Sequence, residues 1–519
     1  MGNPVVNLHS STEIADAESK KLAKTIDDRL SQELVFALVG PVGSGCSTTA
    51  SELKKELENT YKYMVPEIIS VSAIIRRSMH LVGVESCEKS NLEKYVASMQ
   101  DAGNALRKRF GEDYLSKRIV ESIHRSRKSF GAFDEGAIIP KRIAYVIDSI
   151  KNLDELRLLR KIYKETLVLV GVFAPDAQRS ARLNFQEVYQ KVVDQLFQRD
   201  KGEKWSFGQA TRKVFTQSDW FVCNDSTLDE LKRKIRRFLG LVFDIGVQTP
   251  TKAEAAMYKA NAVAGNSACL SRQVGATIVS SRGEFIGMGW NDVPKFGGGL
   301  YDEDTKTESA IDNRCYNWGG NCCHNEVTRN GITRAISSLL LNADFVKKGT
   351  KLADVVAHLS DTPVDALTEF SRSIHAEMEA ILSVAREGKH SLVGSTLYTN
   401  TYPCHNCARH IVASGIVKVV YIEPYLKSHA TKLHYDAITE DPADSESKVF
   451  FQQFDGIAPR NYLKFFRSER DRKAEGGTYL KGDVKNALPR LRIALDGPAR
   501  YEDLIMVSLL DLDNSVGGV

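Results

Sequence analysis

The feature that most constrains the fold is a pair of short motifs in the second half of the chain. They are His375-Ala376-Glu377 and Pro403-Cys404-His405-Asn406-Cys407. One imidazole and two thiolates form a ligand set for zinc that leaves the fourth coordination position open. These residues lie about one helix and one strand apart in sequence, so the fold must bring them together. We predict that each motif begins a helix, because the partial positive charge at a helix N-terminus favours thiolates.

Glu377, two residues after the histidine, indicates what such a metal would do. Zinc lowers the pKa of a water in the open position. A carboxylate at this spacing reaches that water without binding the metal, and it can pass the proton to a ring nitrogen and a leaving amine. The pattern is typical of hydrolytic removal of an exocyclic amine from a nucleobase. The alternative is a closed structural zinc knuckle, which needs a fourth protein ligand and has no use for Glu377.

The first half of the chain has the pattern of a doubly wound α/β domain. Buried strands are predicted at 34–39, 143–147 and 167–173, with long charged helical segments between them. This alternation is typical of a parallel sheet. We expect the boundary at Gln248-Thr249-Pro250-Thr251. The expected organisation is an N-terminal arm over 1–30, a P-loop nucleotide kinase-like domain over 31–247, and a second α/β domain over 250–519.

The second domain is predicted to begin with a helix near Lys252, followed by a hairpin over 274–290, and to contain a long polar insertion over about 295–370. A helix should run from His375 to about 387, and a further strand should cover 417–421. The segment after 460 is basic and irregular in its pattern.

A phosphate-binding loop follows the first predicted strand. Gly40, Gly43, Gly45 and Ser47 match G-x-x-x-x-G-K-[ST], but Cys46 replaces the lysine. The glycines permit a tight turn whose backbone N–H groups bind phosphate, and Ser47 is placed to contact Mg²⁺. Without the lysine, efficient phosphoryl transfer is not expected. The alternatives are a nucleotide bound with Mg²⁺ for sensing, an empty structural relic, and an active kinase or NTPase.

Other residues of the first half support a nucleotide-binding interpretation. Asp148 ends a predicted strand and is a candidate acidic partner for Mg²⁺, although an aspartate at a strand end is more often a turn residue. From Phe36 to Leu239 the pattern resembles small nucleotide kinases, which carry arginines in their later helical segments. The arginines here are Arg179, Arg182 and Arg199.

The insertion contains a second group of potential metal ligands. Cys315, Cys322, Cys323 and His324 are enough for a structural zinc that would hold a long loop. Their spacing, C-x6-C-C-H, is not that of a standard zinc finger. The alternative is the start of a helix with incidental buried thiols.

Composition excludes several classes of protein. The net charge of +4 is small for 519 residues and gives no support for a sequence-independent grip on nucleic acid. Nine cysteines without regular pairing indicate a reducing, cytoplasmic compartment with free thiols and zinc ligands. The first residues have no apolar core of a signal peptide, and no run of about 18 apolar residues predicts a membrane span.

The segment around the zinc motifs resembles the cytidine/deoxycytidylate deaminase superfamily, and its deoxycytidylate branch most closely. The stretch 271–276 resembles that branch's S-R-x-x-G-A strand, and 289–294 resembles its G-Y-N-G-x-P loop. The resemblance implies a C-terminal cytidine-deaminase-like three-layer α/β/α domain. It also implies that Asn291 hydrogen-bonds to the sugar or base and that Arg272 binds substrate. The departures from the family pattern, which leave the substrate and its phosphate number open, are Trp290, Asp292 and Glu379.

The domain order over nearly the whole chain resembles bacterial anti-phage dCTP deaminases, in which a P-loop kinase-like domain precedes a deaminase domain. That resemblance implies conversion of dCTP, and often dCMP, to the deoxyuridine nucleotide plus ammonia. Depletion of dCTP would starve phage DNA synthesis. It further implies a homo-oligomer, and the P-loop domain is the natural place for a regulatory nucleotide.

Three rival functions remain at this stage: a housekeeping dCMP deaminase, a nucleic-acid cytidine deaminase, and a nucleotide-binding regulator with an inactive zinc domain. Free nucleotides are favoured, because the sequence around the motifs lacks the dense pattern of basic and aromatic residues that strand binding needs. The main aromatic cluster, over 450–462, is interpreted as a last core strand. The other interpretation has Arg460, Lys464 and Arg467 contacting substrate phosphates.

Overall fold

The structure is a computed structural model that describes residues 30–517, apart from 86–91, 135–136, 183–207, 209, 310, 344, 361, 368, 426–427 and 469. The chain divides into two compact units. The first unit joins Met1–Thr249 with Leu463–Val519, and the second is Pro250–Tyr462. The expected arm over 1–30 and Arg199 fall almost wholly outside the described residues.

A parallel sheet forms the centre of the first unit. Strand β1 (Leu34–Val39) is flanked by β5 (Ala144–Asp148) and β6 (Leu167–Phe173), all in parallel register. Strand β7 (Trp220–Cys223) pairs with β6, and β2 (Ile69–Ser70) pairs with β5. Every residue of β1 and β6 is buried, as expected for strands covered on both faces by helices.

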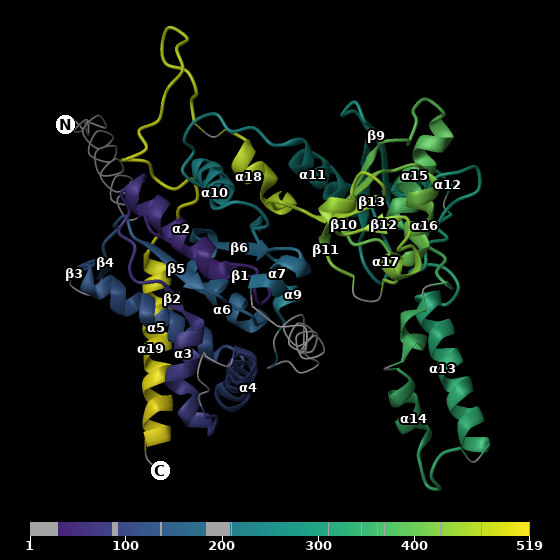
Figure 1. The fold of residues 1–519 in the computed structure, drawn as a ribbon, viewed down its shortest axis with the longest axis horizontal. Coiled ribbons are helices and arrows are strands. Elements are labelled where there is room, and N and C mark those ends of the chain that lie inside the picture. Colours follow the sequence, from purple (N-terminus) through teal and green to yellow (C-terminus); the bar gives the residue numbers. More distant parts are fainter. Residues whose placement is uncertain are drawn as a thin grey trace, which may run out of the picture. The chain divides into compact units, whose positions relative to one another are not determined.

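Helices surround this sheet (Figure 1), and α2 (Cys46–Asn59) begins directly after the glycine-rich loop. It packs against α10 (Leu228–Val242), whose apolar residues lie on one face. The other helices of this unit are α3 (Val71–Ser78), α4 (Leu92–Phe110), α5 (Tyr114–Ser129), α6 (Leu153–Tyr163), α7 (Asp176–Arg182), α9 (Thr211–Phe215) and α19 (Asp496–Gly517). The short strands β3 (Phe133–Asp134) and β4 (Ala137–Ile138) form a separate antiparallel pair.

The end of the chain differs from the sequence-based prediction both in the unit to which it belongs and in its secondary structure. Residues 463–519 were expected to close the second domain, with an irregular tail, but they belong to the first unit and end in the 22-residue helix α19. Figure 1 shows α19 running alongside α5, against which it packs. The physical reason is a buried ion pair: Glu502 of α19 accepts a hydrogen bond from Arg127 of α5, and both side chains are 0% exposed. Arg127 also binds Glu33, at 2.8 Å.

A six-stranded mixed sheet organises the second unit in the order β12-β13-β11-β10-β8-β9. The hairpin of β8 (Gly275–Val279) and β9 (Phe285–Trp290) is antiparallel, as predicted, and β10 (Thr396–Thr401) runs antiparallel to β8. Strand β11 (Lys418–Glu423) then pairs in parallel with β10 and β13 (Val449–Gln453), and β12 (Ile438–Thr439) completes the sheet. The predicted α/β class is therefore confirmed for both units.

Helices α15 (Ala376–Glu387) and α16 (His405–Ala413) carry the two sequence motifs. The remaining helices that begin in this unit are α11 (Lys252–Ala264), α12 (Glu303–Ser309), α13 (His324–Asn342), α14 (Leu352–Leu359), α17 (Ala430–Leu433) and α18 (Tyr462–Phe466). The insertion predicted over 295–370 is thus largely helical. A short strand, β14 (Gly456–Ile457), follows β13.

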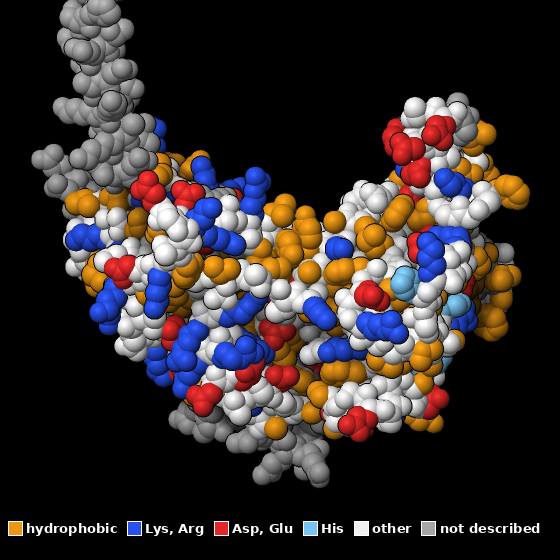
Figure 2. Space-filling model, turned by 90° about the horizontal axis from the view of Figure 1, so that it is seen from above, with side chains coloured by type: hydrophobic (Ala, Val, Ile, Leu, Met, Phe, Trp, Pro, Cys, Tyr) orange, Lys and Arg blue, Asp and Glu red, His pale blue; other side chains and the backbone are white. Residues whose placement is uncertain are grey.

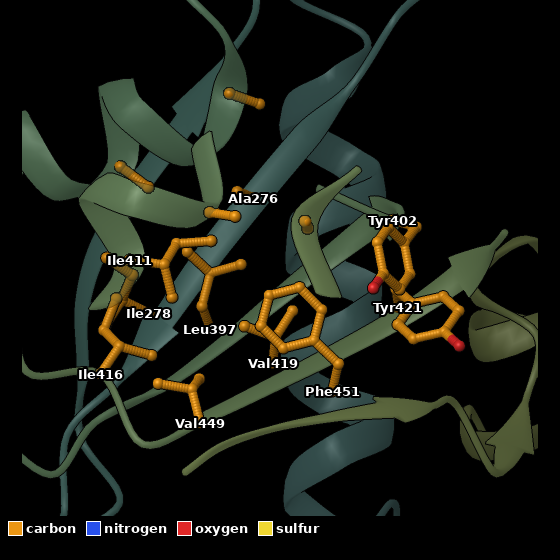
Figure 3. Close-up of a cluster of buried hydrophobic side chains, with 14 of the residues drawn as sticks. Ala276, Ile278, Leu397, Tyr402, Ile411, Ile416, Val419, Tyr421, Val449 and Phe451 are labelled. Carbon is orange, nitrogen blue, oxygen red and sulfur yellow. The ribbon is translucent and has the colours of Figure 1, made fainter. Parts of the chain in front are cut away.

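An apolar core fixes α15 and α16 against the sheet of the second unit (Figure 3). Side chains from the strands, such as Leu397 and Val419, meet Ile411 of α16, and all three are fully buried. Gly289 of β9 is required for the close approach of α15. A Cβ atom there would lie 2.3 Å from the backbone nitrogen of Ala380 and 2.5 Å from the carbonyl oxygen of Ala376. The start of α15 is therefore set by direct backbone packing on β9.

On the face drawn in Figure 2, Lys and Arg side chains are interspersed with acidic and hydrophobic ones. In the described part of the chain, no helix has both the length and the apolar character needed to cross a membrane.

Candidate active site

The three predicted zinc ligands lie together at the start of two helices. His375 is the N-cap of α15, and Cys404 is the N-cap of α16, which also contains Cys407. Neither N-cap side chain bonds to its own helix backbone, so the imidazole and the thiol are available to another partner. Strand β10 leads into Cys404 through Pro403, so the end of this strand places the cysteine motif beside His375.

The spacing of these side chains fits a zinc ion. His375 Nδ1 lies 3.3 Å from Cys404 Sγ and 3.3 Å from Cys407 Sγ. Ligands at usual zinc distances in a tetrahedron are separated by about 3.5 Å. Among the described residues, His375, Cys404 and Cys407 are the group of metal-ligand side chains whose ligand atoms lie within 4.8 Å of one another. Three ligands leave the fourth tetrahedral position for a water or substrate.

Mutual contacts shift the pKa of these groups in the metal-free centre. The hydrogen bond from Cys407, followed by contact with His375, lowers the pKa of Cys404 to about 4. Burial disfavours the imidazolium, but the neighbouring Cys404 thiolate outweighs it and raises the pKa of His375 to about 9. Cys404 is thus held as a thiolate, which is the form that binds metal.

Glu377 lies beside this centre without belonging to it. Its side chain is 4% exposed, and Oε2 is 3.5 Å from Cys407 Sγ. Burial in this environment raises the pKa of the Glu377 carboxyl above its ordinary value. A carboxyl with a raised pKa, next to the open position, is suited to accept a proton and return it.

A pocket of about 340 Å³ opens onto His375, Glu377 and Cys404. Its volume lies at the lower end of the range for small-molecule sites, roughly 300–1,000 Å³. The wall includes Tyr402, whose ring packs against Tyr421 and Phe451 of the core, and Tyr425, together with Asn291 and Arg272. Both residues implied by the family resemblance therefore face the same pocket as the metal ligands.

Asn291 and Arg272 already have protein partners. The Asn291 side chain accepts a hydrogen bond from Val274 N at 2.7 Å and donates one to the Arg272 carbonyl at 2.8 Å. It thereby fixes the strand entry that forms one wall of the pocket. The Arg272 guanidinium is 45% exposed and donates to Glu423 Oε1 at 3.2 Å. The binding of nucleotide by either residue stays a prediction.

Asp292 is a positioning residue that the sequence did not identify. It is 1% exposed, and Oδ2 accepts a hydrogen bond from Ala268 N at 2.9 Å. Its backbone carbonyl accepts one from Ile374 N at 2.9 Å, immediately before His375. Asp292 thus links the loop after β9 to the residue that precedes the metal ligand. The available signal was an aspartate in the loop after a predicted strand, at a position where the family pattern has glycine.

The four residues predicted as a second metal site do not assemble as a ligand set. Cys315, Cys323 and His324 line the active-site pocket, while Cys322 Sγ points to the Gly319 carbonyl, 3.6 Å away. Within the described part of the chain, no three of them bring ligand atoms within 4.8 Å of one another. His324 instead begins α13 and packs beside Trp318, in line with the interpretation as a helix start.

The predicted P-loop has the backbone of an anion-binding loop. Gly43 and Gly45 adopt φ angles of 81° and 90°, which favour glycine, and Gly45 is the N-cap of α2. Ser47 Oγ donates to Asp148 Oδ2 at 2.6 Å, so the two predicted Mg²⁺ ligands are in contact. Burial raises the pKa of Asp148. Cys46 Sγ lies 3.5 Å from Ser44 Oγ.

Two of the predicted arginines and one residue missed from the sequence hold this loop. Arg179 Nε donates to the Val42 carbonyl at 2.8 Å, and Arg182 Nη1 donates to the Ser44 carbonyl at 3.2 Å. Asn224, at the end of β7, also donates to Ser44 O, at 3.0 Å. These contacts fix the loop through its carbonyls, and Ser44 N donates to the Pro41 carbonyl at 3.0 Å within it.

The aromatic cluster after residue 449 belongs to the core. Phe451 is 1% exposed and Phe454 is 0% exposed. Arg460, Lys464 and Arg467 are absent from the described wall of the active-site pocket. Lys464 pairs with Glu165 instead. The structure therefore favours the core-strand interpretation.

Comparison with known proteins agrees with this geometry. Residues 250–423 match the family model described as "Cytidine and deoxycytidylate deaminase zinc-binding region". The deoxycytidylate deaminase of Enterobacteria phage T2 is 33% identical over 187 residues, which cover 34% of this chain and 82% of that protein. The corresponding protein of phage T4 is 31% identical over 184 residues, which cover 34% of this chain and 80% of its own length.

Among solved structures, dCMP deaminase from the cyanophage S-TIM5 in apo form is 19% identical, with a TM-score of 0.22, and the match covers 40% of this chain and 100% of that one. The sequence match to the T2 protein spans most of that enzyme, and the matched family region contains His375, Glu377, Cys404 and Cys407. This chain therefore belongs to the cytidine and deoxycytidylate deaminase family.

Proposed function

We propose that this protein deaminates dCTP, and also dCMP, to the deoxyuridine nucleotide and ammonia. The observation that carries the proposal is the buried Glu377 beside a three-ligand centre that opens into a pocket. The names of the phage relatives support a deoxycytidine nucleotide as substrate. A zinc ion held by His375, Cys404 and Cys407 would supply an activated water for attack at C4 of cytosine.

The residues of the chain account for the rest of the reaction. His375, Cys404 and Cys407 hold the metal, and their two N-cap positions keep the ligand set rigid. Glu377 would take one proton from the attacking water and deliver it to ring N3, and would then carry the remaining proton, from the new C4 hydroxyl, to the amine, which leaves as ammonia. Tyr425 would pack beside the base, and the buried Asn291 would orient the nucleoside through the strand entry that it fixes.

The decisive experiment is incubation of the purified, zinc-loaded chain with dCTP, dCMP, CTP and single-stranded DNA. Uracil products are followed by mass spectrometry. We expect product from the free deoxycytidine nucleotides. Product from DNA alone would overturn the substrate assignment, and a strong preference for dCMP would favour a housekeeping dCMP deaminase.

We further propose that the deaminase acts in the cytoplasm in anti-phage defence, by depleting dCTP as a homo-oligomer, and that the P-loop unit is its sensor. The contact between Ser47 and Asp148, together with the left-handed glycines, supports binding of a nucleotide with Mg²⁺. Cys46 in place of lysine fits binding without efficient phosphoryl transfer. In this arrangement a bound nucleotide regulates the deaminase.

Nucleotide affinity of the first unit tests the sensor. Isothermal titration of the full chain with Mg-ATP and Mg-dNTPs should detect binding, and Cys46→Lys should strengthen it. Absence of binding in both forms would make the loop a structural relic. The defence role is tested by phage plating on cells that express the chain or its Glu377→Gln variant. Equal plating efficiency on the two would contradict the proposed role.

A further inference from the structure

Three arginines face the active-site pocket from different segments of the second unit. Arg272 precedes β8, Arg329 lies in α13, and Arg372 lies in the loop that leads to His375. All three belong to the wall of the pocket that contains His375 and Glu377. Arg329 comes from the helical insertion, which the metal centre itself does not need.

The wall of this pocket contains more basic than acidic side chains. Among the described residues that line the pocket, Glu377 is the one carboxylate, and it lies at the metal centre. The guanidinium of Arg272 is paired with Glu423, at 3.2 Å, whereas that of Arg372 is held by Trp318 and the Asn313 carbonyl. A single phosphate carries about two negative charges. A triphosphate carries more and offers further phosphate oxygens to Arg329 and Arg372.

The position of Arg372 is fixed before any ligand binds. Its guanidinium lies 3.7 Å from the centre of the Trp318 ring, and Nη1 donates to the Asn313 carbonyl at 3.0 Å. A guanidinium has five N–H donors in a planar fork that suits phosphate oxygens. With one donor bound to Asn313, the group can still offer a pair of donors to a phosphate. Stacking on Trp318 reduces the entropy lost on binding.

The start of α13 adds partial positive charge to the same pocket. Its N-cap, Cys323, makes no side-chain cap hydrogen bond, and residues 323–325 line the pocket. The N-terminus of a 19-residue helix carries partial positive charge that favours an anion. Arg329 lies further along this helix, on the same pocket wall. The insertion thus brings both a helix terminus and a guanidinium to the mouth of the site.

We propose that Arg329 and Arg372 bind the phosphates of the substrate beyond the first and thereby select the triphosphate dCTP over dCMP. This inference rests on the proposed deamination of deoxycytidine nucleotides. In it, Arg272, next to the strand entry held by Asn291, contacts the nucleoside monophosphate part that the two substrates share. The helical insertion is then the specificity element of the enzyme.

The test compares steady-state kinetics for dCTP and dCMP in the full zinc-loaded chain and in its Arg329→Gln and Arg372→Gln variants. Each variant should raise KM for dCTP about ten- to hundred-fold, which is the usual effect of losing a charged hydrogen bond. The rise in KM for dCMP should be at least ten-fold smaller. Because these contacts are equal in the ground and transition states, kcat for dCTP should change little.

Arg334→Gln is the matched control, because Arg334 is exposed on the same helix and absent from the pocket wall. It should leave both KM values unchanged. Arg372→Lys keeps the charge but removes the planar fork, so it should show an intermediate loss for dCTP. Zinc content and circular dichroism identify a variant that has not folded.

Direct binding separates this proposal from the deaminase assignment. In the Glu377→Gln background, titration with dCTP and dCMP measures affinity without turnover. Equal losses for both nucleotides, or no loss for either, would overturn the role of Arg329 and Arg372. A wild-type chain that binds dCTP through these arginines but releases no ammonia would instead contradict the proposed function alone.

Discussion

Replacement of Glu377 by glutamine gives the most direct test of the chemistry. The side chain is buried, 4% exposed, and its Oε2 is 3.5 Å from Cys407 Sγ. Glutamine has nearly the same volume, so packing at the start of α15 is preserved. The amide cannot accept and return a proton. The variant therefore removes one chemical property and leaves the pocket shape unchanged.

The expected loss follows from the work that Glu377 performs. General acid–base catalysis contributes about 10²–10⁴-fold to a rate, which is roughly 2.7–5.4 kcal/mol of barrier. Glu377 serves both as base toward water and as acid toward the amine, so the loss in kcat should lie at the upper end of this range. KM should change by less than about three-fold, because the charged groups on the outer wall of the pocket are untouched.

Ammonia release and uracil formation are measured for the wild type and the variant under saturating dCTP. Zinc per chain is measured by atomic absorption, and it should stay at one in both proteins because His375, Cys404 and Cys407 are intact. A Glu377→Gln protein that retained more than about a tenth of the wild-type kcat would refute the assigned role. Loss of zinc from this variant would show instead that Glu377 acts as a ligand.

Three further outcomes are expected. A chelator should abolish the deaminase activity, and added zinc should restore it. The Cys404→Ser variant should retain less than half of the wild-type zinc, which metal analysis of the purified protein measures. Gly289→Ala should lower stability by about 1–3 kcal/mol, since its Cβ would lie 2.3 Å from Ala380 N; an unchanged urea midpoint would contradict the packing of β9 on α15. Glu502→Ala should cost about 3–5 kcal/mol by leaving buried Arg127 with one carboxylate fewer; resistance of α19 to limited proteolysis in this variant would count against the ion pair as its anchor.

The metal centre could be predicted from the sequence because its determinants are local. His375 and Cys404 each begin a helix, and the pattern that marks a helix start is readable within a few residues. The same is true of the glycines before α2, whose left-handed φ angles follow from residue type. In both places the residue type and its neighbours in sequence are enough to predict the local backbone: a helix start at the metal ligands and a tight turn at the glycines.

The return of residues 463–517 to the first unit could not be predicted in this way. Glu502 is an acidic residue in a helix, and nothing nearby in the sequence indicates that it is fully buried. Its burial depends on Arg127, several hundred residues earlier in the chain, and on Tyr163, whose hydroxyl donates to it at 3.0 Å. Long-range charge pairing of this kind has no signal in local periodicity.

The departures from the family pattern can now be interpreted from their contacts. Asp292 holds Ala268 N and, through its backbone, the residue before His375, while Glu379 pairs with Arg386 within α15. None of Trp290, Asp292 and Glu379 lines the described pocket. These contacts show that Asp292 supports the segment before His375 and that Glu379 supports α15 itself. In the proposed selection of dCTP, the helical insertion with Arg329 is the part of the pocket wall whose charge bears on the number of phosphates.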